Sequence, residues 1–231
     1  MKIFAALDVY HDHPHRSAAM NMAVDEALLE YAAIPLIRFY RWQSPALSFG
    51  YFGRFTDVAG YQCERDLVRR WTGGGIVFHG EDLTYSLVIP TSDTAFSESS
   101  ISIYEKIHQA LCDALSETGQ PAVVAAGPDH ATVANLTGIS DAGYSCFANP
   151  VRADVMIDGR KIAGAAQRRT RRGLLQQGSI QGIKLGNGLT EQFAQSLSIN
   201  CHQRKVDEKI LNRARKLAAQ KYGTESWLRK R

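Results

Sequence analysis

The sequence lacks the features that mark several large classes of protein. Its four cysteines stand far apart without a Cys-x-x-Cys pair, which excludes a zinc site of that spacing and a dense disulfide framework. No run approaches the ~20 apolar residues of a membrane span, and Asp8 interrupts the first apolar stretch too early for a signal peptide. The 27 basic residues barely exceed the 23 acidic ones, so a dedicated nucleic-acid binder is disfavoured. We therefore expect a cytoplasmic protein that binds neither nucleic acid nor membrane.

The composition is that of a folded chain. Hydrophobic residues make up 45% of the 231 positions, which is enough to bury a substantial core as one large domain or two small ones. Neither linkers nor internal repeats divide the chain.

Hydrophobic spacing predicts strands in clusters, with helices between the clusters. Without strict alternation of strand and helix, this pattern favours an α+β domain with a mixed or mainly antiparallel sheet over a Rossmann fold. Residues 127–144 show no sustained period. The expected strands cover residues 36–42, 46–52, 66–71, 76–79, 83–89, 154–157, 160–170 and 174–180, and the expected helices cover residues 17–34, 100–118, a short stretch capped by Thr190, and 207–222.

A triple glycine, Gly73-Gly74-Gly75, lies between two of these strands and is flanked by Arg70 and His79. Successive glycines let backbone N–H groups approach a carbonyl or phosphate without side-chain obstruction. A plain hairpin turn is the alternative interpretation.

Lys161 follows the tight turn Asp158-Gly159 and precedes a run of small residues that includes Gly164, Ala165 and Ala166. Small side chains in a strand leave room for a ligand, and a lysine there can bind an acyl carbonyl, a phosphate or a thiolate. The alternative is a solvated hairpin lysine.

Cys146 stands 15 residues before Lys161. Because a nearby cation lowers the pKa of a thiol, a Cys–Lys pair is a plausible nucleophile and activator. The alternative is an inert, half-buried thiol. Cys63, Cys112 and Cys201 lack such a setting and are interpreted as structural.

Two groups of charged or ionisable residues remain. His11, His13 and His15 alternate around a proline in an expected N-terminal loop, and we predict no metal site there. Around the last hairpin, four arginines form the densest basic patch of the sequence, which is either a solvated turn or a docking surface for an acidic partner. These are Arg168, Arg169, Arg171 and Arg172. The terminal residues 229–231 are expected to fray.

Together these segments resemble the superfamily of lipoate–protein ligases, octanoyltransferases and biotin–protein ligases. Residues 69–79 resemble its Arg-Arg-x-x-Gly-Gly-Gly-x-Val-x-His motif, and residues 158–167 resemble its lysine motif. Residues 21–29 and 221–227 also match one branch, so the resemblance covers nearly the whole chain. It implies a bent, largely antiparallel sheet flanked by helices.

Residues 145–150, Ser-Cys-Phe-Ala-Asn-Pro, resemble the Cys-Phe-x-x-Pro segment of the cysteine-dependent octanoyltransferases. This resemblance implies transfer of an octanoyl or lipoyl group from acyl carrier protein to a lipoyl-domain lysine, in 2-oxoacid dehydrogenase complexes or glycine cleavage H protein. Cys146 would form the acyl thioester, Lys161 would stabilise the thiolate, and no cofactor would be needed. The implied acyl-binding residues are Arg70, Gly73, Gly74, Gly75, His79, Gly164, Ala165 and Ala166. Carrier domains are typically acidic, which gives the arginine hairpin a use.

Two alternatives stay open. An ATP-dependent lipoate ligase would use ATP and magnesium to form an acyl-adenylate at Lys161, and Cys146 would be incidental. A non-catalytic module that binds acyl groups or carriers is the other. Gly53 stands where the octanoyltransferase branch tends to have glutamine, and Ala165 replaces a common serine. We expect residues 1–231 to form one catalytic domain without an accessory domain.

Overall fold

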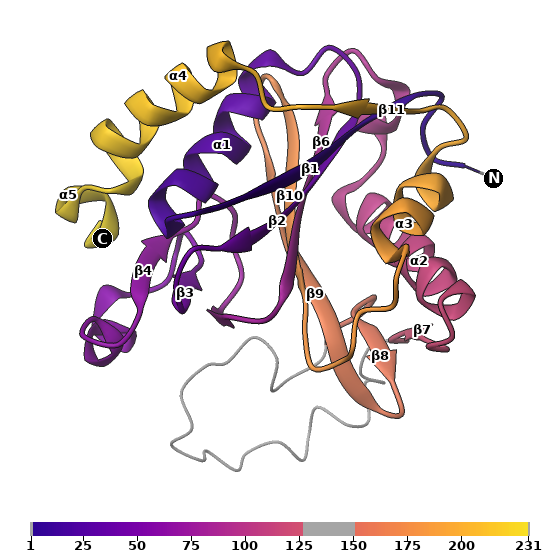
Figure 1. Cartoon of the computed structure of the whole chain (residues 1–231), viewed down its shortest axis with the longest axis horizontal. Helices are drawn as coiled ribbons and strands as arrows, with labels where there is room; N and C mark the ends of the chain where they lie inside the picture. The colour runs from indigo at the N-terminus through magenta and orange to yellow at the C-terminus, as the bar shows by residue number, and fades with distance from the viewer. Residues whose placement is uncertain (1, 127–150, 231) are drawn as a thin grey trace.

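The computed structural model describes residues 2–126 and 151–230. A large mixed sheet runs through the molecule, with helices against both of its faces and a small second sheet beside it (Figure 1). This is the α+β architecture that the strand clusters predict.

The large sheet has eight strands in the order β11-β1-β2-β6-β10-β9-β8-β7. Strand β1 runs parallel to both β2 and β11, and every other pairing in this sheet is antiparallel. In chain order the strands are β1 (Leu7–Arg16), β2 (Leu36–Trp42), β6 (Leu83–Pro90), β7 (Val123–Val124), β8 (Val155–Ile157), β9 (Arg160–Arg169), β10 (Gly173–Ile180) and β11 (Cys201–Arg204).

The small sheet has the order β4-β3-β5 and holds the triple glycine in the connection between β4 and β5. Its strands are β3 (Ala46–Phe49), β4 (Asp66–Arg69) and β5 (Ile76–His79), with β3 parallel to β4 and antiparallel to β5. Strand β3 ends at Phe49, earlier than predicted, because Gly50 to Gly53 form a turn in which the Gly53 N–H donates to the Gly50 carbonyl (2.9 Å).

The helices α1 (Ala18–Tyr31) and α4 (Glu208–Leu217) cover one face of the large sheet, and α2 (Ser100–Glu117) and α3 (Leu189–Leu197) cover the other (Figure 1). Side-chain oxygens of Ser17, Ser99 and Asp207 accept N–H groups at the starts of α1, α2 and α4, as expected of N-caps. Helix α3 begins at Leu189 after Gly188, which adopts positive φ, and not after Thr190 as predicted. A five-residue π-helix, Ala218–Tyr222, follows α4, and α5 (Glu225–Leu228) follows the π-helix. Short 3₁₀ turns occupy Phe55–Asp57, Ala59–Tyr61 and Thr94–Ser97.

Helices on both faces explain why every residue of β6 is buried. Tyr85, Leu87 and Ile89 pack into the core beneath α2 and α3. The intervening residues Thr84 and Ser86 face α1, where a polar stripe crosses the sheet. The His79 network described below lies on this second face.

The N-terminal segment corrects a prediction. Residues 7–16 form strand β1 in the interior of the sheet, whereas the sequence suggested a loop around the histidines. Pro14 is tolerated because it lies in the irregular stretch between Asp12 and Arg16, where the pairing with β2 shifts register.

The C-terminal segment also differs from the expected frayed tail. The Arg69 guanidinium donates to the carbonyls of Trp227 (3.0 Å), Leu228 (2.9 Å) and Lys230 (2.7 Å), which fastens this end to β4. Arg69 also binds the carbonyls of Tyr51 and Gly53, at 2.8 and 2.6 Å. Arg69, the first arginine of the motif, therefore stabilises the fold by connecting β4 to the C-terminal segment and to the turn at residues 50–53.

None of the helices within residues 2–126 and 151–230 is long and apolar enough to cross a membrane.

Candidate active site

Lys161 owes its direction to a bulge in β9. Val155 of β8 pairs with Ala163, but the next residue, Met156, pairs with Lys161, so β9 holds one extra residue at this point. The extra residue shifts the alternation of side chains, and the Lys161 side chain consequently lies over the α-carbon of Gly164. The bulge thus brings Lys161, Gly164 and Ala166 to one face of the strand.

A carboxylate holds Lys161 in place. Its ammonium pairs with Asp154 Oδ2 at 2.8 Å, and both side chains are almost completely buried. The Tyr104 hydroxyl of α2 donates to Asp154 Oδ1 (2.8 Å) and accepts the N–H of Ala165 (3.0 Å). Burial, together with the Asp154 charge, raises the pKa of Tyr104 far above its usual value, so Tyr104 remains a donor. Asp154 also accepts the N–H of Val151 (2.7 Å).

Gly164 is required by this arrangement. A Cβ atom at this position would lie 2.6 Å from Lys161 Cε and 2.8 Å from Nζ. Any larger residue would displace the lysine, so the small residue predicted to make room for a ligand makes room for Lys161 itself.

His79 stands in a second polar network. Its Nδ1 lies 2.8 Å from Asp82 Oδ2, and its Nε2 lies 2.6 Å from Ser48 Oγ. Because the Asp82 carboxylate can only accept, Nδ1 carries the proton and the Ser48 hydroxyl donates to Nε2. Burial lowers the pKa of His79 although Asp82 opposes this, so the ring is neutral at pH 7. The ring also stacks on Trp42, with centroids 4.0 Å apart.

Arg70 connects this network to the triple glycine. One guanidinium nitrogen donates to Ser48 Oγ (2.7 Å), and the other donates to the carbonyls of Gly73 (3.1 Å) and Gly75 (2.8 Å). Gly74 adopts φ of +83°. A Cβ on Gly50 would lie 2.0 Å from the Gly74 carbonyl oxygen, so two glycine segments are packed backbone to backbone. The triple glycine is therefore a loop whose conformation is fixed by Arg70 and by packing against Gly50, and it is not a plain hairpin turn.

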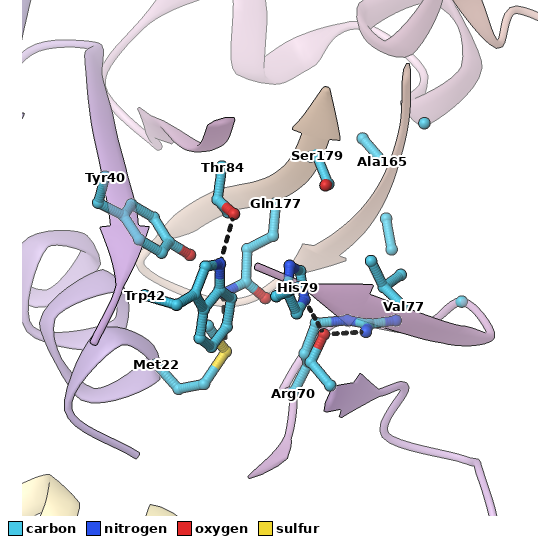
Figure 2. A pocket seen from close by; sticks show the side chains of 15 residues that line it. Met22, Tyr40, Trp42, Arg70, Val77, His79, Thr84, Ala165, Gln177 and Ser179 are labelled. Carbon is cyan, nitrogen blue, oxygen red and sulfur yellow. Dashed lines mark hydrogen bonds between the residues drawn. The ribbon is translucent and has the colours of Figure 1, made fainter. Parts of the chain in front are cut away.

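Between the two networks lies a narrow pocket of about 30 Å³, which opens to solvent at its mouth. Figure 2 shows Trp42 and Met22 on one side of it and Val77 and Ala165 on the other, with His79 between them. Of the predicted acyl-binding residues, Arg70, Gly74, His79, Gly164, Ala165 and Ala166 line this pocket. Gly73 and Gly75 flank it through their contacts with Arg70.

Several lining residues have no signal in the sequence motifs. Gln177 donates to Asp25 Oδ2 (2.7 Å) and accepts from the Thr72 hydroxyl (2.8 Å), so it joins α1 to the residue before the triple glycine. The buried Asp25 carboxylate also pairs with Arg38 at 2.7 Å. A buried polar residue within a predicted strand is the signal that could have revealed Gln177.

The hairpin arginines do not form one patch. Arg168 shares the pocket face of β9 and lies over the rings of Tyr51 and Trp71. Arg169 points to the opposite face, where it binds the carbonyl of Phe96 (2.5 Å) and Ser100 Oγ (3.1 Å). Arg171 and Arg172 are exposed at the turn.

The cysteines divide as follows. Cys146 lies outside the described residues, so its role stays a prediction. Burial raises the pKa of Cys112 to about 12, and it also raises the pKa of Cys201, which disfavours thiolate chemistry at both. Cys63 is exposed.

The N-terminal histidines line a separate pocket beside α3. The rings of His11 and His13 stack with centroids 6.2 Å apart. Within residues 2–126 and 151–230, no three His, Cys, Asp or Glu side chains gather as a metal site would require.

Comparison with solved structures defines the class of the fold. A lipoate-protein ligase A bound with ATP superposes with a TM-score of 0.74, at 21% identity, over 99% of this chain and 98% of that one. A bi-partite lipoate protein ligase from Thermoplasma acidophilum, described together with its E2 lipoyl domain, gives 0.69 at 21% identity over 97% and 96%. The fold is thus that of the lipoate–protein ligases.

A sequence model of the lipoyl protein ligase A/B catalytic domain matches residues 17–217. The chain belongs to this family, which confirms the predicted resemblance. Curated relatives include octanoyltransferase LipM of Oceanobacillus iheyensis, 38% identical over 175 residues, or 71% of this chain and 60% of the relative. The protein of the same name from Carboxydothermus hydrogenoformans is 37% identical over 177 residues, or 73% and 62%. The alignments span about 60% of the length of these relatives.

Proposed function

We propose that this protein is an octanoyltransferase of protein lipoylation, which moves an octanoyl or lipoyl group onto the lysine of a lipoyl domain. The relatives named octanoyltransferase LipM support the reaction. The observation that carries it is the placement of Lys161 over Gly164, beside a pocket with an apolar wall. A cation in that position can bind the acyl carbonyl as negative charge develops on its oxygen.

The proposed reaction has two steps. The Cys146 thiolate attacks the thioester carbonyl of the donor, a new carbon–sulfur bond forms, and the donor thiol leaves with a proton. The neutral acceptor lysine then attacks the enzyme thioester, forms an amide, and returns the thiol of Cys146. Lys161 stabilises the thiolate and the oxyanion, while the Gly73–Gly75 loop, held by Arg70, lines the carbonyl end of the pocket. Neither step needs a nucleotide or a metal.

The donor in this proposal is acyl carrier protein, and the acceptors are lipoyl domains of 2-oxoacid dehydrogenase complexes or glycine cleavage H protein. The pocket sets the acyl group, since burial of each CH₂ contributes ~0.8 kcal/mol. Trp42 and Met22 form the apolar wall that would receive the chain.

Intact-mass analysis after incubation with octanoyl carrier protein tests this function. We expect an octanoyl adduct on the wild type without ATP, loss of the adduct on Cys146→Ala, and transfer to a lipoyl domain only from the wild type. Acylation of the lipoyl domain that requires ATP and survives Cys146→Ala would instead establish the ligase. Acyl binding without any transfer would establish a non-catalytic module.

A further inference from the structure

A group of cations and aromatic rings lies beside the pocket and takes no part in the chemistry described above. We call it the cation–aromatic surface, and it consists of Tyr51, Trp71, Arg168, Lys221, Trp227 and Lys230. The Lys221 ammonium lies 4.1 Å from the ring centre of Trp71 and 4.4 Å from that of Trp227. The Lys230 ammonium donates to the Tyr51 hydroxyl at 2.7 Å. Residues from four separate segments of the chain therefore meet here.

This surface adjoins the pocket through two of its members. Arg168 follows the lining residue Ala166 by two positions on the same face of β9, a distance of roughly 7 Å at the usual rise of a strand. Trp71 precedes the triple glycine by two positions, and the Arg168 guanidinium lies over its ring at 4.8 Å. A molecule seated on this surface can thus reach the pocket.

The surface has an excess of positive charge. Within the described part of the chain, Glu26 is the carboxylate that pairs with one of its three cations, at 2.5 Å from Lys221 Nζ. Burial lowers the pKa of Lys221 although Glu26 opposes this, and the nearby positive charges of Arg168 and Lys230 lower the pKa further. Arg168 Nε is buried without a hydrogen-bond partner among the described residues. Carboxylates from another molecule would relieve the repulsion among the three cations.

An apolar contact is available at the edge. Phe52 is 86% exposed and lies against Tyr51 in a T-shaped contact, at the tip of the turn between Gly50 and Gly53. An exposed aromatic ring beside stacked cations is typical of protein interfaces, where aromatic residues and arginine are enriched.

We propose that the cation–aromatic surface docks a carboxylate-rich face of the protein domain that carries the acceptor lysine. The inference rests on the proposed function. The acceptor fits better than the acyl donor because its lysine must lose a proton before it attacks, and neighbouring cations favour the neutral amine. Carboxylates on the docked domain supply the attraction that brings this lysine to a positively charged surface. The surface, and not the tip of the arginine hairpin, then selects the acceptor.

Titration of an intact lipoyl domain against charge-reversal variants tests the proposal. We expect Arg168→Glu and Lys230→Glu each to weaken its Kd about tenfold at low salt, with the difference shrinking at high salt. Lys205→Glu is the matched control, since Lys205 is exposed beyond β11, at the other edge of the sheet from this surface, and it should change Kd less than twofold. Lys230 is exposed at the end of the chain, so its reversal tests the surface even where Arg168→Glu disturbs folding.

A second measurement separates this proposal from the proposed function. Acyl loading from a small octanoyl-pantetheine thioester should be equal in the wild type, Lys230→Glu and Lys205→Glu. If the wild type is not loaded, the proposed function fails, whereas the Kd series still reports on docking. Unchanged Kd in both surface variants would overturn the proposal. So would weakening by Arg171→Glu alone, or weaker binding of the acyl carrier protein with lipoyl-domain binding unchanged.

Discussion

Two buried pairs of a carboxylate and a basic group lie beside the pocket, at what we call its Lys161 end and its His79 end, and they differ in what holds the basic group. At the Lys161 end, the ammonium pairs with Asp154, and the side chain crosses a glycine that leaves space for it. At the His79 end, described residues engage both ring nitrogens and Trp42 covers one face of the ring. Lys161 lies beside the pocket without lining it, whereas His79 lines the pocket and contacts, through Ser48 and Arg70, the glycine loop.

Each end also contains a buried histidine, and the two histidines differ in what surrounds the ring. His79 faces the carboxylate of Asp82, which opposes the effect of burial on its pKa. His108, behind Lys161, donates to the carbonyl of Ala153 (2.5 Å), and its ring contacts the Tyr104 ring in a tilted arrangement. Burial lowers the pKa of His108 to about 4. The Lys161 end should therefore be the more sensitive to acid.

Removal of Lys161 should have the largest effect. We expect Lys161→Met to lower octanoyl transfer about a thousandfold, equivalent to about 4 kcal/mol, because the cation is lost and the buried Asp154 carboxylate no longer has a positive charge beside it. Transfer to a lipoyl domain measured by intact mass checks this, with Lys184→Met, an exposed lysine, as the control. More than a tenth of wild-type transfer in Lys161→Met would remove Lys161 from the mechanism.

The second-largest effect should be a loss of stability in acid, caused by protonation of His108 at the Lys161 end. His108 binds a proton in the unfolded chain below pH 6.5 but only near pH 4 in the fold, so its contribution to stability is complete above pH 6.5 and lost as pH falls toward 4. The free energy of unfolding should decrease by about 3 kcal/mol across this range. Urea unfolding at pH 7, 5.5 and 4.5 measures it. In His108→Gln the dependence should flatten, and an equally steep loss would contradict the assignment.

At the His79 end, Asp82→Asn should lower the free energy of unfolding by about 2 kcal/mol. The carboxylate accepts from His79 Nδ1, Thr84 Oγ1 and Ser179 Oγ, and an amide cannot satisfy all three donors. Urea unfolding at pH 7 checks this against Asp113→Asn, an exposed position on α2 that should lose less than 0.5 kcal/mol. If the two variants were equally stable, the hydrogen bonds of Asp82 would not contribute to the stability of the pocket wall.

The smallest expected effect comes from a substitution at Gly164, which changes only the space that Lys161 occupies. Gly164→Ala adds one methyl group where Lys161 lies, so transfer should fall about tenfold, or about 1.4 kcal/mol, through displacement of the lysine. Gly80→Ala is the matched control, because a Cβ there meets nothing within 4 Å and the backbone is unstrained. Equal rates in the two variants would show that Lys161 does not depend on the space over Gly164.

The motifs in the sequence predicted the fold and six of the fifteen residues that line the pocket. The triple glycine and the Lys161 segment are contiguous in sequence, and their strands have clear alternation, so they could be located without a structure. Asp154, Tyr104 and Ser48 could not, since their roles depend on contacts with partners 7, 50 and 31 residues away. Strand β1 was missed because Pro14 and exposed histidines break its alternation in the irregular stretch. Arg168 and Arg169 differ in role because successive residues of a strand point to opposite faces.

The bulge in β9 has a further consequence for how this strand tolerates change. The alternation of side chains between the two faces of the sheet changes by one residue at the bulge, because β9 holds one extra residue there. A deletion of one residue between Lys161 and Gly164 would leave the hydrophobic composition almost unchanged. It would nevertheless turn every side chain on one side of the deletion to the opposite face of the sheet. Insertions and deletions at this point should therefore be far more damaging than substitutions, because the number of residues in this segment determines which side chains face the pocket.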